Sequence, residues 1–330
     1  MQIMLMILSC IRGLESFEEG AKAPSAQTLR DRLHLDGDWL DYFHKTMWNI
    51  AKTMICRFRR YKWWISIDET HIPFFGNRKK LNKELVTKGL GTLVHGYRAK
   101  TPGATGSFCF LMISLCCWHI RIPIAIKIIS IKEQRKPWLK PLLKRLITLI
   151  PQATILADRG FGSATWFYQM LEELNAKYVV RIPLRKDENK RKVKNGATKF
   201  QYWMKNKETK EKVLLTVRVV KDKQNRLYLL STNLEDMTNK EVLTTYLHRW
   251  DIENIFKDSD RVLLPTSSRN PLMRLWCVVT SFFLFTLWQV NKLFTPVTSL
   301  RTFLKQIINL LCQLLKCVIN ALGMLVDRPP

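Results

Sequence analysis

The sequence is poor in acidic residues for its size. Its 27 Asp and Glu residues oppose 54 Lys and Arg residues, which gives a net charge of +27 at pH 7. An excess of this size is too large to reflect solubility alone, and it indicates a polyanionic partner, most commonly nucleic acid. The anionic surface of a membrane is the competing partner. Because the basic residues extend from Arg57 to Arg301, we expect many parts of the fold to touch the polyanion.

The cysteines lack the spacings that bind metal. None of the eight forms a Cys-x2-Cys pair, and the histidines are not spaced to complete a zinc site. Most cysteines stand among apolar residues, as buried free thiols do. We therefore predict a reducing, cytoplasmic setting. The apolar stretch Met1 to Cys10 has no basic leader, so we expect a short helix there rather than a secretion signal.

Uninterrupted apolar runs of membrane-spanning length, about 20 residues, are also lacking. The run from Trp276 to Val290 is shorter than that. The run from Ser107 to Ser130 is longer, but Arg121, Pro123 and Lys127 interrupt it, and β-branched residues dominate its second half. This composition predicts two buried strands, and it leaves a membrane protein as the less favoured alternative.

The order of apolar, basic and turn-forming segments predicts five regions. We expect a helical N-terminal region over 1–60, the first part of a core over 61–183, a basic β-rich insertion over 184–235, completion of the core over 236–295 and a helical tail over 296–330. The N-terminal region either binds DNA ends or covers the core, because no helix-turn-helix spacing decides between the two.

Within the core, period-2 patterns and turn residues predict strands and their connections. The predicted strands cover Trp63–Asp68, Leu93–Lys100, Phe108–His119, Ile120–Ser130, Ala153–Asp158 and Lys177–Ile182. Three more in the insertion cover Phe200–Met204, Val213–Val220 and Leu227–Ser231. Arg78 to Lys80 is expected to form a basic loop, and Pro137 to Leu149 a helix with proline in its first turn.

Two of these strands are short, apolar and end on an acid. Asp68 ends the first, and Asp158 ends the other. A carboxylate at the end of a buried strand is costly unless it is paired or binds a metal. After Asp158 come a glycine turn and then a helix that Ser163 is expected to cap, which places Asp158 where crevices open in α/β sheets.

The stretch from Tyr246 to Lys257 has no Gly or Pro, and its pattern predicts a helix. Tyr246, Arg249, Glu253 and Lys257 fall along one stripe of that helix. The stripe suits a metal-assisted site that grips a phosphodiester, with Glu253 for the metal and Arg249 for the phosphate. A solvated helix face with an ordinary Glu253–Lys257 pair is the alternative.

A run of basic residues begins the insertion. We expect its rim to contact the DNA backbone, and a solvated charged loop is the alternative. The residues concerned are Arg185, Lys186, Lys190, Arg191 and Lys192.

Three acids therefore stand out: Asp68, Asp158 and Glu253. Three carboxylates that converge on two divalent cations are what in-line displacement at phosphorus needs. One cation activates the attacking water or 3′-hydroxyl, and the other stabilises the leaving oxygen. Mg²⁺ is the expected occupant because every ligand is a hard oxygen, and Mn²⁺ is expected to substitute for it.

These motifs resemble those of a known family, the DDE transposases of prokaryotic insertion sequences, in the branch related to the insertion-sequence-four group. Asp68-Glu69-Thr70 resembles the first-acid motif, and Ala157-Asp158-Arg159-Gly160-Phe161 resembles the second. Tyr246-x2-Arg249-x3-Glu253 resembles the third, and a β-rich insertion before the last acid also matches. The likeness spans about residues 63 to 295.

The resemblance implies an α/β fold: a ribonuclease-H-like mixed sheet flanked by helices, with a β-rich insertion before the last acid and helical N- and C-terminal regions. It implies that Asp68, Asp158 and Glu253 are the metal ligands. It also implies that Tyr246 and Arg249 contact phosphates near the cleaved transposon end.

The chain departs from the family pattern at one position. The family has a Lys seven residues after the Glu, and here Asp260 stands in its place. Either Lys257, one turn earlier, takes over the DNA contact, or the copy is degraded. Two further residues each allow two interpretations. Arg159 either orients the site or pairs with an acid, and Trp166 either stacks on a flipped base or packs in the core.

The function expected from the sequence is cut-and-paste transposition by a homodimer on double-stranded DNA, at terminal inverted repeats and target DNA. Water attacks first, and the freed 3′-hydroxyl then attacks the target. The expected location is the cytoplasm, with the nucleoid and away from membranes. A catalytically inactive DNA-binding remnant and a ribonuclease-H-like nuclease remain the alternative functions.

Overall fold

The computed structural model describes residues 39–96, 102–117, 120–183, 187–206, 209–260 and 271–293, together with 299, 302, 303, 306 and 307. The chain divides into two compact units. One runs from His44 to Asn254, and the other joins Met1–Phe43 with Ile255–Pro330. Asp68, Asp158 and Glu253 all belong to the first unit. The helices predicted before residue 39, most of the predicted tail, and Arg185 and Lys186 lie outside the described residues.

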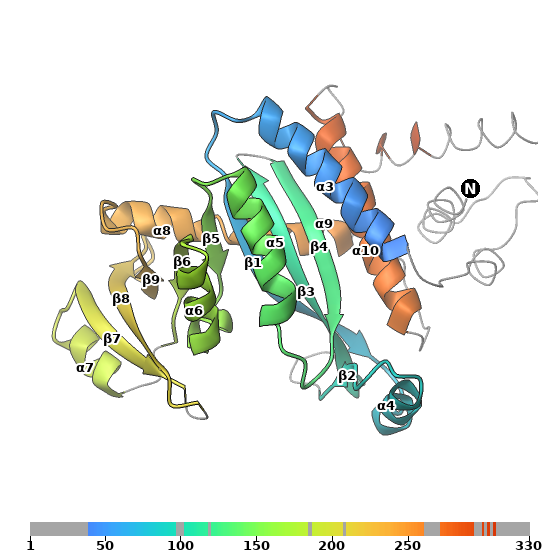
Figure 1. The fold of residues 1–330 in the computed structure, drawn as a ribbon, viewed down its shortest axis with the longest axis horizontal. Helices are drawn as coiled ribbons and strands as arrows, with labels where there is room; N and C mark the ends of the chain where they lie inside the picture. Colours follow the sequence, from blue (N-terminus) through green and yellow to red (C-terminus); the bar gives the residue numbers. More distant parts are fainter. Residues whose placement is uncertain are drawn as a thin grey trace, which may run out of the picture. The chain divides into compact units, whose positions relative to one another are not determined.

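Nine strands form one mixed sheet in the order β2-β3-β1-β5-β6-β9-β8-β7, with β4 also paired to β3 (Figure 1). The strands are β1 (Trp64–Phe74), β2 (Val94–His95), β3 (Gly106–Cys117), β4 (Ile120–Ile129), β5 (Thr154–Ala157), β6 (Lys177–Arg181), β7 (Lys199–Lys205), β8 (Lys212–Lys221) and β9 (Leu227–Thr232).

The pairing directions divide the sheet into two parts. β1, β3 and β4 pair antiparallel, whereas β5 adds to β1 in parallel and β6 adds to β5 in parallel. Beyond β6 the strands of the insertion, β9, β8 and β7, continue the same sheet in antiparallel fashion. The order β4-β3-β1-β5-β6 is that of a ribonuclease-H-like core. The predicted α/β fold, with its mixed sheet flanked by helices, is therefore confirmed.

Helices precede, separate and follow these strands along the chain. They are α3 (Trp39–Arg57), α4 (Arg78–Thr87), α5 (Lys136–Leu149), the 3-10 turn η1 (Phe161–Ser163), α6 (Thr165–Glu173), α7 (Asp187–Lys194), α8 (Asn239–Leu247), α9 (Trp250–Asp260) and α10 (Pro271–Asn291). α8 packs on β6, β8 and β9, whereas α6 packs on α5 and β8. Glu173 of α6 joins the two helices through Lys136 and Lys140 of α5, at 2.8 and 2.6 Å.

The long apolar run from Ser107 to Ser130 forms two strands, as predicted. Every residue of β3 is buried, and β3 is an interior strand, paired with β1 along one edge and with β4 and β2 along the other. A strand covered on both faces needs no polar alternation, so its composition approaches that of a membrane segment. Among the described residues, one helical window, Met273–Asn291, is long and apolar enough to span a membrane. It is 78% buried, as the core helix of a soluble protein also is.

Two predicted strand boundaries are wrong. β1 does not end at Asp68 but continues to Phe74, because β3 pairs with it along its whole length. The strand predicted over Leu93–Lys100 is reduced to Val94–His95, and residues 97–100 lie outside the described part of the chain.

Local capping explains two further differences. The predicted basic loop at Arg78 begins α4 instead, because the Asn77 side chain accepts a hydrogen bond from the Lys80 N–H at 3.0 Å. Ser163 does not cap α6. Ala164 precedes that helix, and the Ser163 hydroxyl donates to the Gly160 carbonyl at 2.9 Å.

Gly162 shows how closely the turn after β5 approaches β6. A Cβ added at Gly162 would overlap the carbonyl oxygen of Arg181. We expect Gly162→Ala to lower the free energy of unfolding by about 2–3 kcal/mol, because a backbone atom cannot move aside as a side chain does. Urea denaturation measures this loss.

Gly96→Ala is the matched control for this substitution. Its added Cβ would meet only the far end of the Arg78 side chain, 2.7 Å away, which is free to rotate. We expect the control to cost less than about 1 kcal/mol. Equal losses in the two variants would contradict the close approach at Gly162.

Candidate active site

Asp68 and Asp158 lie side by side because their strands are neighbours. β1 and β5 pair in parallel from Trp64 opposite Thr154 to Ile67 opposite Ala157, and each acid is the next residue along its strand. The parallel register therefore sets the two acids at the same level, where β5 ends and β1 continues without it. Both line a cleft of about 460 Å³.

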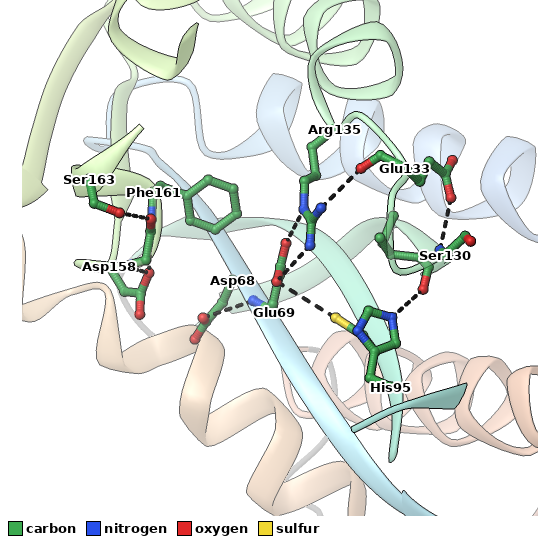
Figure 2. A network of polar contacts seen from close by, with 12 residues as sticks. Asp68, Glu69, His95, Ser130, Glu133, Arg135, Asp158, Phe161 and Ser163 are labelled. Atoms are coloured by element: carbon green, nitrogen blue, oxygen red, sulfur yellow. Dashed lines mark hydrogen bonds and ion pairs between the residues drawn. The ribbon is translucent and has the colours of Figure 1, made fainter. Parts of the chain in front are cut away.

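The turn after β5 holds Asp158 through its backbone. The Asp158 Oδ1 atom accepts hydrogen bonds from the N–H groups of Gly160 at 2.8 Å and Phe161 at 3.4 Å. A Cβ at Gly160 would lie 2.9 Å from that same oxygen, which explains the glycine in the second motif. The turn thereby fixes the carboxylate where the strand stops (Figure 2).

The third motif is not one continuous helix, which corrects the prediction for Tyr246 to Lys257. α8 ends at Leu247, and α9 begins at Trp250. Between them the backbone makes tight i to i+3 hydrogen bonds, from the N–H of His248 to the carbonyl of Thr245 at 3.2 Å and from that of Arg249 to Tyr246 at 2.9 Å. Such a 3-10 turn changes the direction of the chain without breaking it.

Contacts with the sheet hold the joint between α8 and α9 in place. The His248 ring stacks on Trp64 of β1, with centroids 3.8 Å apart and planes within 17°. Asp251, in the first turn of α9, pairs with Arg121 of β4, Nε to Oδ1, at 2.9 Å. Sequence reasoning missed this pair. The signal for it was Arg121 itself, a charged residue within an apolar strand that needs a partner.

The insertion also reaches the third motif. Arg218 of β8 is buried, and its guanidinium donates to the carbonyls of Leu234 at 2.9 Å and Glu235 at 2.8 Å, just ahead of α8. A capping box then starts α8, with Thr238 accepting from the Glu241 N–H and Glu241 accepting from the Thr238 N–H. The strands of the insertion thus position the beginning of the helix that leads to Glu253.

Arg249 connects the predicted acids. Its Nη1 atom lies 3.4 Å from Asp68 Oδ2, its Nη2 donates to Glu253 Oε1 at 2.6 Å, and its Nε donates to the Tyr246 hydroxyl at 3.2 Å. The Arg249 side chain is only 8% exposed, whereas that of Glu253 is 52% exposed. Burial acts to lower the pKa of Arg249, but Tyr246, Glu253 and Asp68 raise it above its usual value.

The charged form of the Asp68 carboxyl is destabilised by its surroundings. Burial, followed by the charge of Asp158, raises the pKa of its carboxyl to about 7, although Arg249 and the Glu69 N–H act to lower it. The single positive charge of Arg249 therefore does not compensate the negative charges of the carboxylates. The donor set is hard oxygen, so a divalent cation of the Mg²⁺ class would fit here and supply the missing positive charge.

The remaining predicted DNA-contacting residues lie on different elements of the chain. Arg159 is exposed beside Asp158 and makes no ion pair with another described residue, and Lys257 is exposed on α9. Arg191 is exposed on α7. Lys192 contacts β7, where its Nζ donates to the Gln201 carbonyl at 3.2 Å. The structure describes no side chain for Lys190.

Some residues that line the cleft were not predicted from the sequence to lie together. Trp166 is half-buried and lines the cleft together with Phe161, so it neither lies wholly in the core nor stands free. Glu69 and Arg135 also line it and form an ion pair, with Nε 2.7 Å from Oε1. The two residues are 66 positions apart, and only the folded sheet brings them together.

The raised pKa of Asp68 gives a prediction for the metal-free protein. Since the folded state binds this proton more tightly than the unfolded chain, the charge of Asp68 costs stability above about pH 7, and the cost disappears as the pH falls through 7 towards 4. We expect Asp68→Asn to stabilise the protein in chelator at about pH 8 by on the order of 1–3 kcal/mol, and less at about pH 5.

Thermal denaturation at the two pH values measures this gain, and Asp236→Asn, at an exposed position, is the control. A gain that does not shrink on acidification would show that the charge of Asp68 is not its source.

Comparison with known proteins agrees with this geometry. The family model described as "Transposase DDE domain" matches residues 62–268, a segment that contains Asp68, Asp158 and Glu253. A search of curated proteins found no match. The family match covers more than half of the 330 residues and includes the whole sheet and both helices of the third motif. The chain therefore belongs to the DDE transposases, enzymes that act on DNA.

Proposed function

We propose that this transposase moves its own insertion sequence by a cut-and-paste reaction, in which phosphodiester hydrolysis is followed by strand transfer. The observation that carries the proposal is the pairing of β1 with β5. It sets two carboxylates side by side, and burial with the Asp158 charge raises the pKa of Asp68 to about 7. Such a pair favours binding of cations.

Asp68, Asp158 and Glu253 are the proposed ligands for two Mg²⁺ ions, which Mn²⁺ replaces. When bound, the cations activate the attacking water or 3′-hydroxyl and stabilise the leaving oxygen. Glu253 is half-exposed and paired with Arg249, so a rotation of its side chain would make its oxygens available to a cation. Asp158 stays fixed by the backbone N–H groups of its turn.

Arg249 and Tyr246 are the proposed phosphate contacts. If Glu253 held a cation, the Nη2 atom of Arg249 would be available to donate to a phosphate oxygen, while Nε would stay on the Tyr246 hydroxyl. The contacts among Tyr246, Arg249 and Glu253 persist across the joint between α8 and α9, which supports membership of the insertion-sequence-four-like group with its Tyr-x2-Arg-x3-Glu signature.

The proposed substrate is double-stranded DNA at the terminal inverted repeats and at the target, bound by a homodimer in the cytoplasm with the nucleoid. The net charge of +27 supports this substrate. The basic residues Arg185, Lys186, Lys190, Arg191 and Lys192 are proposed to follow the DNA backbone, with Arg159 near the acids. Three of them, Lys190, Arg191 and Lys192, lie on α7 beside β7, at the edge of the sheet (Figure 1).

The proposal predicts loss of cleavage without loss of DNA binding. We expect Asp158→Ala to reduce Mg²⁺- or Mn²⁺-dependent cleavage of end DNA by at least about 100-fold, because two-metal displacement needs every carboxylate. Gel assays of strand cleavage and of DNA binding measure the two properties separately. Glu172→Gln, at an exposed acid on α6, is the matched control and should keep full cleavage.

Equal cleavage by wild type and Asp158→Ala would remove Asp158 from the mechanism. Two other outcomes separate the alternatives. Salt-sensitive binding without metal-dependent nicking in the wild type would identify an inactive remnant, an alternative that Asp260 favours because it replaces the Lys expected there. Cutting of branched DNA without joining of ends would identify a ribonuclease-H-like nuclease.

The proposed DNA contact of Lys257 gives a separate test. We expect Lys257→Ala to weaken binding of end DNA and to lower the slope of log affinity against log salt by about 1, the value for one phosphate contact. Lys240→Ala, at an exposed lysine of α8, is the control. Identical salt slopes for the two variants would assign no phosphate to Lys257.

A further inference from the structure

The first motif carries two acids that face opposite sides of the sheet. Successive residues of a strand alternate between its faces. Asp68 lies on the face of Trp64, which packs with Val242 and Tyr246 of α8, so Glu69 lies on the other face. There Glu69 pairs with Arg135, which immediately precedes α5. Figure 2 shows the two carboxylates leaving β1 in different directions.

On the face of Glu69, three unlike donors gather. His71 pairs directly opposite Cys109 of β3, and Glu69 lies two residues before His71 on the same face. The Cys109 thiol donates to Glu69 Oε2 at 3.6 Å. One carboxylate oxygen, one imidazole nitrogen and one sulfur all lie within 4.8 Å of one another.

Neighbouring groups orient these donors as they do around bound metals. Arg135 Nε donates to Oε1 of Glu69 at 2.7 Å, whereas Arg135 Nη2 lies 3.5 Å from Oε2, the oxygen that also accepts from the Cys109 thiol. The carbonyl of Glu133 fixes Arg135 in turn, at 2.9 Å from Nη1. The Ser107 hydroxyl lies 3.1 Å from His71 Nδ1 and fixes that ring. Outer hydrogen bonds of this kind set the direction of metal ligands.

We propose that Glu69, His71 and Cys109 form a second metal site, one that takes a borderline-soft cation of the Zn²⁺ class and is separate from the Mg²⁺ site of the three acids. Sulfur and imidazole favour Zn²⁺ over Mg²⁺, whose ligands are oxygens. A thiolate and a carboxylate would bring two negative charges to the cation, and the carboxylate would share its charge with Arg135. The thiol gives up its proton to solvent on binding.

Three protein ligands leave one position of a tetrahedral cation open. Glu69 and His71 line the same cleft as Asp68 and Asp158, since β1 continues past the end of β5 and exposes its edge there. The open position therefore has access to the cleft. The site also adjoins the catalytic acids directly, because the Glu69 N–H donates to Asp68 Oδ1 at 2.8 Å.

Cobalt reports on such a site without any measurement of transposition. We expect Co²⁺ added to the reduced, metal-free full chain to bind one ion with a sulfur-to-cobalt charge-transfer band and the intense visible bands of tetrahedral Co²⁺, both removed by Zn²⁺. Cys109→Ser should abolish the charge-transfer band. Cys117→Ser, which alters another buried cysteine of β3, should keep it.

Calorimetric titration with Zn²⁺ gives a second readout. We expect His71→Ala, at an exposed position, and Glu69→Gln each to weaken Zn²⁺ binding by at least about 10-fold. Asp158→Asn should leave the cobalt spectrum unchanged, which separates this site from the proposed catalytic one. No charge-transfer band in the wild type, or one that survives Cys109→Ser, would overturn the proposal whatever the cleavage assays show.

Discussion

The parallel pairing of β1 with β5 is the constraint on which the rest of the site depends. It ends after Ile67 and Ala157, so two carboxylates emerge from adjacent strands at the same level. Burial, and next the charge of Asp158, makes the charged form of Asp68 unfavourable, and the raised pKa of Asp68 reflects that cost. On our proposal this cost is offset in the working enzyme, because the same carboxylates hold the cations.

The third acid, Glu253, is positioned near this pair by two helices joined by a turn, not by one continuous helix. The turn between α8 and α9 is held by His248 on Trp64 and by Asp251 on Arg121. Arg249, inside the turn, touches both Asp68 and Glu253. The guanidinium thus stabilises the acids before metal binds, and on our proposal it contacts phosphate afterwards. One side chain thereby serves the free and the DNA-bound enzyme.

The two faces of β1 give the first motif two environments. Asp68 faces the helices of the third motif, whereas Glu69 faces Arg135 and the donors of β3. The two environments are linked by one hydrogen bond, from the Glu69 N–H to Asp68 Oδ1 at 2.8 Å. A soft-metal site beside a hard-metal site would give the cleft two chemistries, distinguished by the ligands and not by the overall charge.

The sequence by itself determined the strands of the core and most helices, because local hydrophobic period and spacing encode them. It singled out Tyr246, Arg249 and Glu253, but it predicted one helix where the structure has a turn between α8 and α9. It did not determine that β1 passes Asp68, since pairing with β3 decides where that strand ends. Nor did it show the ion pair of Arg135 with Glu69, or the cluster of Cys109 with His71. These contacts join distant segments, and strand register, which only the tertiary structure fixes, brings them within reach.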